Sequence, residues 1–128
     1  MKATVVGAGL AGCEAAWALA RRGVEVTLIE MKPKKISPAH RCAGFAELVC
    51  SNSLKAMRTE SASGLLKEEM RAMGSLLLRC AEQCAVPAGG ALAVDRDRFS
   101  ALVTAGIEEE ERIRIERHEV CEIPSKGA

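Results

Sequence analysis

The chain has few aromatic residues and no marked excess of charge of either sign. Its 128 residues include no tyrosine, and the aromatic side chains are Trp17, Phe45 and Phe99, so a hydrophobic core must be mainly aliphatic. The 18 Lys and Arg residues nearly balance the 17 Asp and Glu residues, which gives no global electrostatic reason to expect binding to nucleic acid or membrane. No segment approaches the roughly 18 uninterrupted apolar residues of a membrane-spanning helix.

Signals for disulfides, metal binding and export are also missing. The six cysteines form no C-x-x-C pair and no spacing typical of a disulfide framework. No zinc-helix, P-loop or serine-elbow motif is present, so we expect no metal site. Residues 10–13 resemble a lipoprotein cleavage site, but glycines interrupt the apolar run before Cys13 and an amphipathic pattern continues after it. Without an export signal, a cytoplasmic protein with reduced thiols is expected.

The most informative feature is a glycine motif near the N-terminus. Gly7, Gly9 and Gly12 form G-x-G-x-x-G directly after an apolar run, residues 3–6, that predicts a strand. One glycine permits a tight turn, one lets backbone approach a pyrophosphate, and one lets the following helix pack on the strand. The pyrophosphate then lies at the helix N-terminus, where free N–H groups and the dipole attract negative charge. The predicted cofactor-binding residues are Gly7, Ala8, Gly9, Leu10, Ala11 and Gly12.

A second strand and an acidic residue complete this pattern. A helix over residues 10–22 is expected to end at Gly23, and residues 24–29 predict a strand that leads to Glu30. Glu30 is close to the ~20-residue offset at which an acid binds a ribose 2′-hydroxyl. A carboxylate there favours FAD or NAD and repels a 2′-phosphate. The sequence therefore predicts a Rossmann-like βαβ unit of the α/β class that binds FAD or NAD, with a ligand-free glycine turn as the competing interpretation.

Residues 31–58 predict an irregular, locally basic insert. Its proline residues at 33 and 38 prevent a regular helix in its first half, while the apolar run 45–50 argues against disorder. Six basic residues oppose Glu47 alone: Lys32, Lys34, Lys35, Arg41, Lys55 and Arg58. This balance suits phosphates of a cofactor or an RNA, but a solvated cluster of lysines explains it equally well. Trp17 is expected to pack against an insert rather than stack on a cofactor.

The rest of the chain predicts further helices and strands. The elements are a helix over 63–84, which Gly74 weakens or kinks, a strand over 91–94, a helix over 96–110 capped by Asp95, and a strand over 113–123. Cys80 and Cys84 are interpreted as small helix residues. These elements make an incomplete parallel sheet with a helical insert. We therefore expect residues 1–128 to be the N-terminal part of an FAD-binding domain, with the rest of the protein missing.

Cys50 is the candidate catalytic residue. The apolar run before it leads to a polar turn, residues 51–53, within the basic insert. Nearby positive charge raises the thiolate fraction of a cysteine and so makes it a nucleophile. A buried, inert cysteine is the competing interpretation. His40 is a possible acid–base group, whereas His118 is expected at the surface.

Several blocks of the sequence together resemble one known family. They are VGAGLAG at 6–12, EAAW at 14–17, Glu30-Met31 with Pro33, PAH at 38–40, FAELVCSNSL at 45–54, KEEMR at 67–71 and VPAGGALAVDR at 86–96. In this order they resemble the N-terminal part of the bacterial folate- and FAD-dependent tRNA (uracil-5-)-methyltransferases of the TrmFO type, which are related to GidA. The blocks around Cys50 and at 86–96 are far more specific than the glycine motif. The sequence departs from the family at residues 41–44, and Cys42 is an added thiol without an assigned role.

The resemblance implies a concrete reaction. Methylenetetrahydrofolate would donate one carbon to a uridine C5 in the tRNA T-loop, with FAD as cofactor and NADPH or NADH as the electron source. Cys50 matches one functional cysteine of the family and would act as nucleophile, base or flavin-shielding group. Partners would be tRNA, folate and nicotinamide, with no membrane. Two alternatives stay open: a GidA-like flavoprotein that modifies wobble uridines, and a non-catalytic dinucleotide-binding module.

Overall fold

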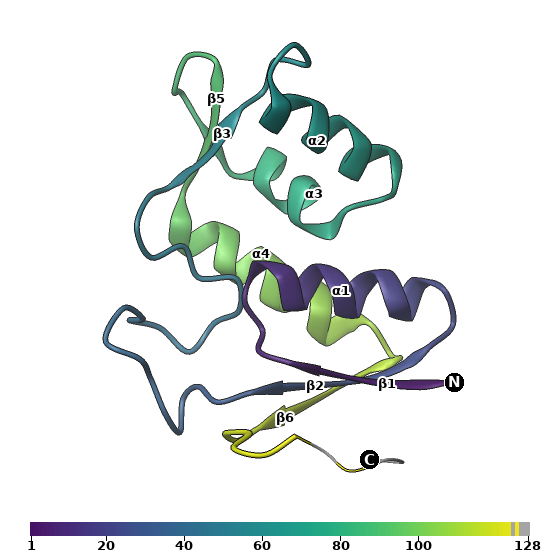
Figure 1. Ribbon diagram of the computed structural model, residues 1–128. Coiled ribbons are helices and arrows are strands. Elements are labelled where there is room, and N and C mark those ends of the chain that lie inside the picture. Colours follow the sequence, from purple (N-terminus) through teal and green to yellow (C-terminus); the bar gives the residue numbers. More distant parts are fainter. Residues whose placement is uncertain (124, 126–128) are drawn as a thin grey trace.

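The computed structural model describes residues 1–123 and residue 125. The elements follow in the order β1 (Lys2–Val6), α1 (Leu10–Arg21), β2 (Glu25–Glu30), β3 (Ser53–Ala56), α2 (Ala62–Ala72), α3 (Leu76–Gln83), β4 (Ala85–Val86), β5 (Ala91–Val94), α4 (Arg96–Glu109) and β6 (Ile113–Arg117). Figure 1 shows a parallel sheet with α1 and α4 on one face, and above α1 a second layer that contains α2, α3 and a small sheet.

The main sheet confirms the predicted α/β fold with a parallel sheet. Its strand order is β1-β2-β6, and β2 pairs in parallel with both neighbours. Parallel neighbours need a crossover connection, which α1 supplies between β1 and β2 and the segment containing α4 supplies before β6. The last strand is shorter than predicted, because β2 ends at Glu30, the partner of Arg117, and offers no backbone beyond it.

The upper layer differs from the sequence-based expectation in two ways. The helix predicted over 63–84 is two helices, because Gly74 adopts a left-handed φ of 80° that ends α2, and the Ser75 hydroxyl caps α3 by accepting from the N–H of Leu78. In addition, β3, β5 and β4 form an antiparallel sheet, for which the sequence predicted only the strand at 91–94. The irregular insert therefore ends in a strand.

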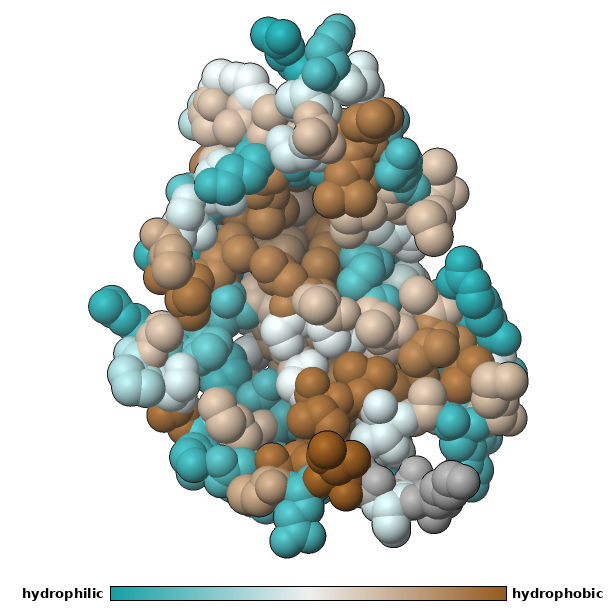
Figure 2. Space-filling model, in the orientation of Figure 1, coloured by the Kyte–Doolittle hydropathy of each residue, from teal (hydrophilic) through white to brown (hydrophobic). Residues whose placement is uncertain are grey.

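The core joins the two layers and is largely aliphatic, as the composition predicted. Its largest fully buried side chains include Phe45, Phe99, Leu28 and Leu76. Figure 2 shows that hydrophobic residues also reach the surface around the upper layer, and the exposed ones on α2 include Leu65 and Leu66. Within the described residues, no helix combines the length and apolar character needed to cross a membrane.

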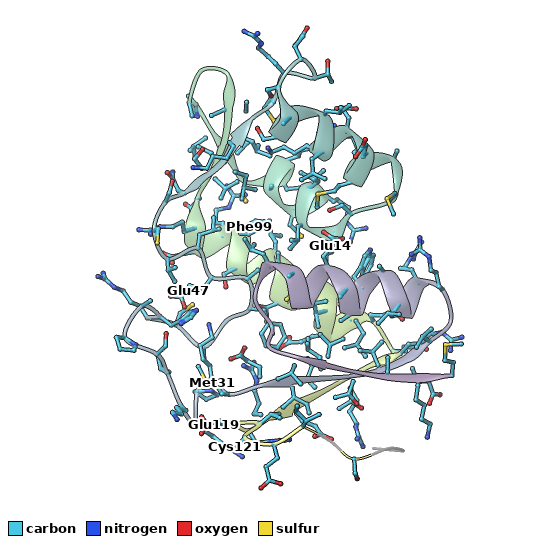
Figure 3. All side chains as sticks on the ribbon, viewed as in Figure 1. Glu14, Met31, Glu47, Phe99, Glu119 and Cys121 are labelled. Atoms are coloured by element: carbon cyan, nitrogen blue, oxygen red, sulfur yellow. The ribbon has the colours of Figure 1, made fainter. Side chains whose placement is uncertain are left out.

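Helix α1 is joined to the upper layer by the hydrogen bonds of two side chains, Glu14 and Trp17. The Glu14 carboxylate accepts hydrogen bonds from the Ser75 hydroxyl (2.6 Å) and from the backbone N–H groups of Leu76 (3.0 Å) and Leu77 (3.2 Å). It therefore caps the N-terminus of α3 from a different helix (Figure 3). The Trp17 indole Nε1–H donates to the carbonyl of Gly74, which lies between α2 and α3 and outside the insert at 31–58, at 3.2 Å. Trp17 therefore packs against the upper layer.

Candidate functional site

The three glycines of the motif occupy three different environments. Gly7 has a φ of 92°, which favours glycine, and its N–H donates to the Ile29 carbonyl at 2.7 Å. A Cβ on Gly12 would lie 1.8 Å from the Gly7 carbonyl oxygen, so the helix can approach the loop this closely only without a side chain. A Cβ on Gly9 would meet no atom within 4 Å. Gly9 thus faces open space at the start of α1.

The N-terminus of α1 has the properties of an anion-binding site. Its N-cap is Gly9, which provides no side-chain hydrogen bond, and its first turn carries no acidic residue. The first N–H groups of a helix have no partner within that helix. Their partial positive charge adds to the helix dipole. A phosphate can therefore approach Leu10, Ala11 and Gly12 without displacing a capping side chain.

Glu30 lies beside this loop at the carboxyl end of β2. Its Oε1 accepts from the Ala8 N–H and its Oε2 from the Lys32 N–H, both at 2.9 Å, and the residue is 7% exposed. A carboxylate has about four lone-pair sites, so these two bonds leave acceptor capacity for a hydroxyl. The structure thus brings the predicted glycine loop and Glu30 together in one corner.

This corner fits the adenosine diphosphate part of FAD. The open space at Gly9 gives a pyrophosphate direct access to the helix N-terminus, and the Glu30 carboxylate can accept hydrogen bonds from a ribose diol. The side chains of the loop itself do not fill the space, since they are Ala8, Leu10 and Ala11 beside the glycines. The arrangement can bind a dinucleotide, but the reactive ring would extend beyond the corner.

The second half of the insert packs against the glycine loop. The Ala46 N–H donates to the Ala8 carbonyl at 2.9 Å, and the Phe45 side chain is fully buried. Helix α4 fixes Phe45 on both sides: its carbonyl accepts from the Ser100 hydroxyl at 2.6 Å, and its N–H donates to the Thr104 hydroxyl at 2.9 Å. Hydrogen bonds therefore hold the segment from Gly44 to Ala46 in place beside the glycine loop.

Lys32 is buried in an ion pair with Glu47 beside this segment, which corrects the interpretation of Lys32 as a phosphate-binding or solvated residue. Lys32 is only 4% exposed, and its Nζ contacts the Glu47 carboxylate at 3.2 Å and the Gly44 carbonyl at 2.7 Å. Burial alone would raise the pKa of Glu47, but the N–H of Arg41 and the Lys32 ammonium outweigh it and lower that pKa. Lys32 is therefore neither solvated nor available to a phosphate.

Arg117 also holds this segment in place, although no sequence motif singles it out. Its Nη1 donates to the carbonyls of Lys32 and Ala43, each at 3.0 Å. Its guanidinium lies 4.5 Å from the centroid of the Phe45 ring. Arg117 thus joins the end of β6 to both halves of the insert. The identity of its partners depends on the tertiary fold, since they are more than 70 residues away along the chain.

Cys50 is exposed, which contradicts the interpretation as a buried, inert cysteine. It lines a shallow cavity of about 330 Å³ with Ser51, Asn52, Val94 and Arg96. Arg96 is held there by a hydrogen bond from its Nη1 to the Leu48 carbonyl at 3.4 Å. Cys50 belongs to the same insert as the segment beside the glycine loop, but no recorded contact joins its thiol to the loop.

Three of the other thiols are buried, and the two histidines contact neighbouring polar groups. Burial raises the pKa of Cys13 to about 12 and also raises the pKa values of Cys80 and Cys84, so their thiolates are scarce. His40 contacts the Ser37 hydroxyl at 2.5 Å. His118 is exposed and pairs with Glu116 at 3.0 Å, as expected of a surface residue. The described residues contain no group of three or more potential metal ligands.

The chain is similar to known proteins over almost its whole length. The family model described as glucose inhibited division protein A matches residues 2–128. The methylenetetrahydrofolate–tRNA-(uracil-5-)-methyltransferase TrmFO of Acetivibrio thermocellus is 59% identical over 123 residues, which cover 96% of this chain and 28% of that protein. The protein of the same name from Geotalea uraniireducens is 60% identical over 126 residues, covering 98% of this chain and 29% of that protein.

A solved structure shares the fold at lower sequence identity. Aquifex aeolicus GidA in its form II crystal superposes with a TM-score of 0.77 and 20% identity, over 98% of this chain and 21% of that chain. At this identity the likeness shows the fold alone. The chain spans less than a third of the length of the curated relatives described above.

Proposed function

Because the chain belongs to the glucose inhibited division protein A family, we propose that it is the N-terminal, FAD-binding part of a flavoprotein that methylates a T-loop uridine of tRNA at C5. The proposal assigns methylenetetrahydrofolate as carbon donor, NADPH or NADH as co-substrate, and the cytoplasm as the location. The names of the highly identical relatives support the reaction class.

The arrangement of Glu30 and the glycine loop supports the binding of FAD. The Glu30 carboxylate bonds to the Ala8 N–H at 2.9 Å while Gly9 next to it faces open space. The loop N–H groups at residues 10–12 would hold the pyrophosphate, and Glu30 would hold the adenosine ribose. FAD bound there would supply the electrons that reduce the transferred carbon. The chain's own residues bind and orient the adenylate half of that group.

Cys50 is the residue proposed to act on the uridine. Uracil C5 is a poor nucleophile until a thiolate adds at C6 and moves electron density to C5. The Cys50 thiol is exposed, so a substrate base can reach it, and Arg96 lines the same cavity. A base role or a flavin-shielding role uses the same exposure. The three roles differ in whether a covalent bond to C6 forms.

The test extends the chain with the sequence encoded downstream of Ala128 and measures methyl transfer to a tRNA transcript. We expect Cys50→Ala to lower the rate of methyl transfer at least ~100-fold. Cys121→Ser, which changes another exposed cysteine, should leave this rate unchanged. Trapping with 5-fluorouridine-containing tRNA should give a covalent complex that depends on Cys50 if it is the nucleophile. An unchanged rate in Cys50→Ala would remove this residue from the mechanism.

The family model and the shared fold also favour a second candidate, a GidA-like enzyme that modifies wobble uridines. The two candidates differ in the position of the modified nucleotide. Mass spectrometry of nuclease fragments of the treated tRNA locates the added mass in the T-loop or in the anticodon. A non-catalytic module would bind a dinucleotide and leave both positions unmodified.

A further inference from the structure

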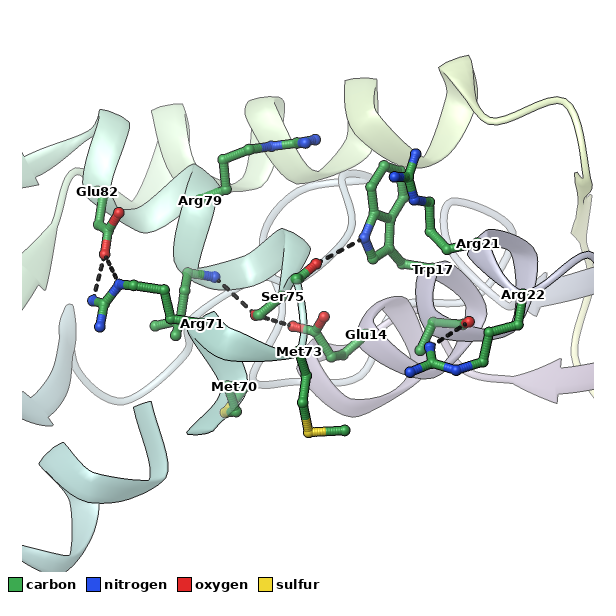
Figure 4. Close-up of a pocket in the computed structure, with 13 residues that line it drawn as sticks. Glu14, Trp17, Arg21, Arg22, Met70, Arg71, Met73, Ser75, Arg79 and Glu82 are labelled. Carbon is green, nitrogen blue, oxygen red and sulfur yellow. Dashed lines mark hydrogen bonds and ion pairs between the residues drawn. The ribbon is translucent and has the colours of Figure 1, made fainter. Parts of the chain in front are cut away.

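The groove between α1 and the upper layer has no role in the proposed reaction, and its lining is rich in arginine. Residues of α1, α2, α3 and the turn between α2 and α3 line a cavity of about 510 Å³. Four arginines and two glutamates are among them, which gives a formal charge of +2, while the whole chain carries only +1. The groove is therefore locally positive in a protein whose overall charge is nearly balanced (Figure 4).

The two acidic residues of the groove are already compensated. The Glu14 carboxylate accepts three hydrogen bonds at the N-terminus of α3. Glu82 pairs with Arg71. Within the part of the chain that the structure describes, Arg21, Arg22 and Arg79 form no ion pair. These three guanidinium groups are the ones available to an external anion.

Two of these arginines are held in place by the only tryptophan. The guanidinium carbons of Arg21 and Arg79 lie 5.4 and 5.1 Å from the centroid of the Trp17 ring. The ring is itself fixed by its hydrogen bond to the Gly74 carbonyl and is 9% exposed. Such cation–π contacts orient the guanidinium groups before a ligand arrives, so fewer side-chain rotamers are lost on binding.

The groove also has an apolar side. Met70 lines it, and Met73 at the end of α2 is 72% exposed. Planar guanidinium groups beside apolar side chains match the alternation of phosphates, sugars and bases in RNA: arginine binds phosphate through paired N–H groups, and bases stack on guanidinium planes. An acidic protein segment would engage the charges but would not use the apolar side in this way.

We propose that this groove, lined by Arg21, Arg22 and Arg79, is a docking surface for the sugar–phosphate backbone of a structured RNA. The inference rests on the proposed function, which makes tRNA the RNA in question. Helix α1 has 12 residues and is about 18 Å long. The groove at its C-terminal half is therefore separate from the glycine loop at its N-terminus, and none of its lining residues lines the cavity at Cys50.

The experiment measures binding of a fluorescein-labelled tRNA transcript to the 128-residue chain by fluorescence anisotropy at several NaCl concentrations, without FAD or folate. We expect Arg22→Ala and Arg79→Ala each to weaken binding about fivefold and to lower the slope of log Kd against log salt by about 1. Arg79→Lys should keep the slope but weaken binding, because it keeps the charge and loses the planar guanidinium. Arg112→Ala, which changes an exposed arginine that does not line the groove, should bind like the unchanged chain.

Two outcomes would overturn the inference. One is equal tRNA affinity in Arg22→Ala, Arg79→Ala and Arg112→Ala, with each variant folded by circular dichroism. The other is displacement of tRNA by polyglutamate at matched charge, which would identify a surface for acidic proteins. The binding assay needs no turnover. Arginine-dependent RNA binding by this chain, together with no methyl transfer by the extended chain, would refute the proposed function and leave the groove assignment standing.

Discussion

Two glycine-to-alanine changes should separate the structural and ligand-binding roles of the glycine loop. In Gly12→Ala, the new Cβ would lie 1.8 Å from the Gly7 carbonyl oxygen, whereas ordinary contact begins at 3.4 Å. Helix and loop must therefore move apart by the difference, 1.6 Å. Overpacking of a rigid backbone contact costs about 3 kcal/mol or more. We expect Gly12→Ala to be strongly destabilised.

Gly9→Ala should instead leave stability almost unchanged and weaken ligand binding. The added methyl group meets no atom within 4 Å, and the backbone at φ −77°, ψ −167° is allowed for alanine. The free energy of unfolding should change by less than about 0.5 kcal/mol, because reduced freedom of the unfolded chain offsets a slightly poorer N-cap. The methyl group would, however, occupy the path of the pyrophosphate. We expect ADP to bind at least ~10-fold more weakly, which corresponds to about 1.4 kcal/mol.

The assays are urea unfolding followed by Trp17 fluorescence and calorimetric titration with ADP. Trp17 is the only tryptophan and is buried where α1 meets the upper layer, so its emission reports the packing of α1, the helix that Gly12→Ala displaces. Gly90→Ala, which also meets no atom within 4 Å and lies in the turn before β5, is the matched control for both measurements. Unchanged ADP binding in Gly9→Ala, or unchanged stability in Gly12→Ala, would refute this account of the loop.

Two further predictions concern the charged contacts of Glu14 with α3 and of Glu47 with Lys32. Glu14→Gln keeps the shape but loses the charge that faces the N-terminus of α3, and it should lower the free energy of unfolding in urea by about 2 kcal/mol; a loss below 0.5 kcal/mol would contradict the capping role. The pKa of Glu47 is lowered from 4.5 in the fold, so its stabilising contribution is complete above that pH and is lost as the pH falls below it. Glu47→Gln should therefore reduce the dependence of the free energy of unfolding on pH in the acid range. By leaving Lys32 buried without a counter-charge, it should also cost about 3 kcal/mol at neutral pH. A variant whose free energy of unfolding falls with acid pH as steeply as that of the unchanged chain would argue against this role of Glu47.

The sequence predicted those parts of the fold that depend on residues close together along the chain. The glycine motif, the apolar runs beside it and the position of Glu30 follow local rules, and the structure places them in one corner. The helical periodicity of residues 63–84 continues across Gly74, so the pattern alone could not show that the chain turns there. Strand β3 has four residues and includes Lys55 at a φ of 71°, which leaves too little alternation to recognise.

The environment of the charged residues was harder to predict, because it depends on contacts between distant segments. Lys32 belongs to a basic run, yet it is buried because Glu47, 15 residues later, folds back to it. Arg117 finds its partners more than 70 residues upstream. Charge counts describe a segment as a whole and cannot assign one lysine to an ion pair and another to solvent. The exposure of Cys50 likewise depends on where α4 and β5 lie.

Helix α1 connects the two proposed binding sites, and this makes their dependence on it testable. Its N-terminus forms the pyrophosphate corner, Glu14 in its middle caps α3, and Trp17 in its C-terminal half positions the groove arginines. A shift of the whole helix must disturb both sites, whereas an added methyl group at its first turn disturbs one. Gly12→Ala should therefore weaken ADP and tRNA binding together, and Gly9→Ala should weaken ADP binding alone. Equal loss of tRNA binding in both variants would mean that RNA contacts the glycine loop itself rather than the groove.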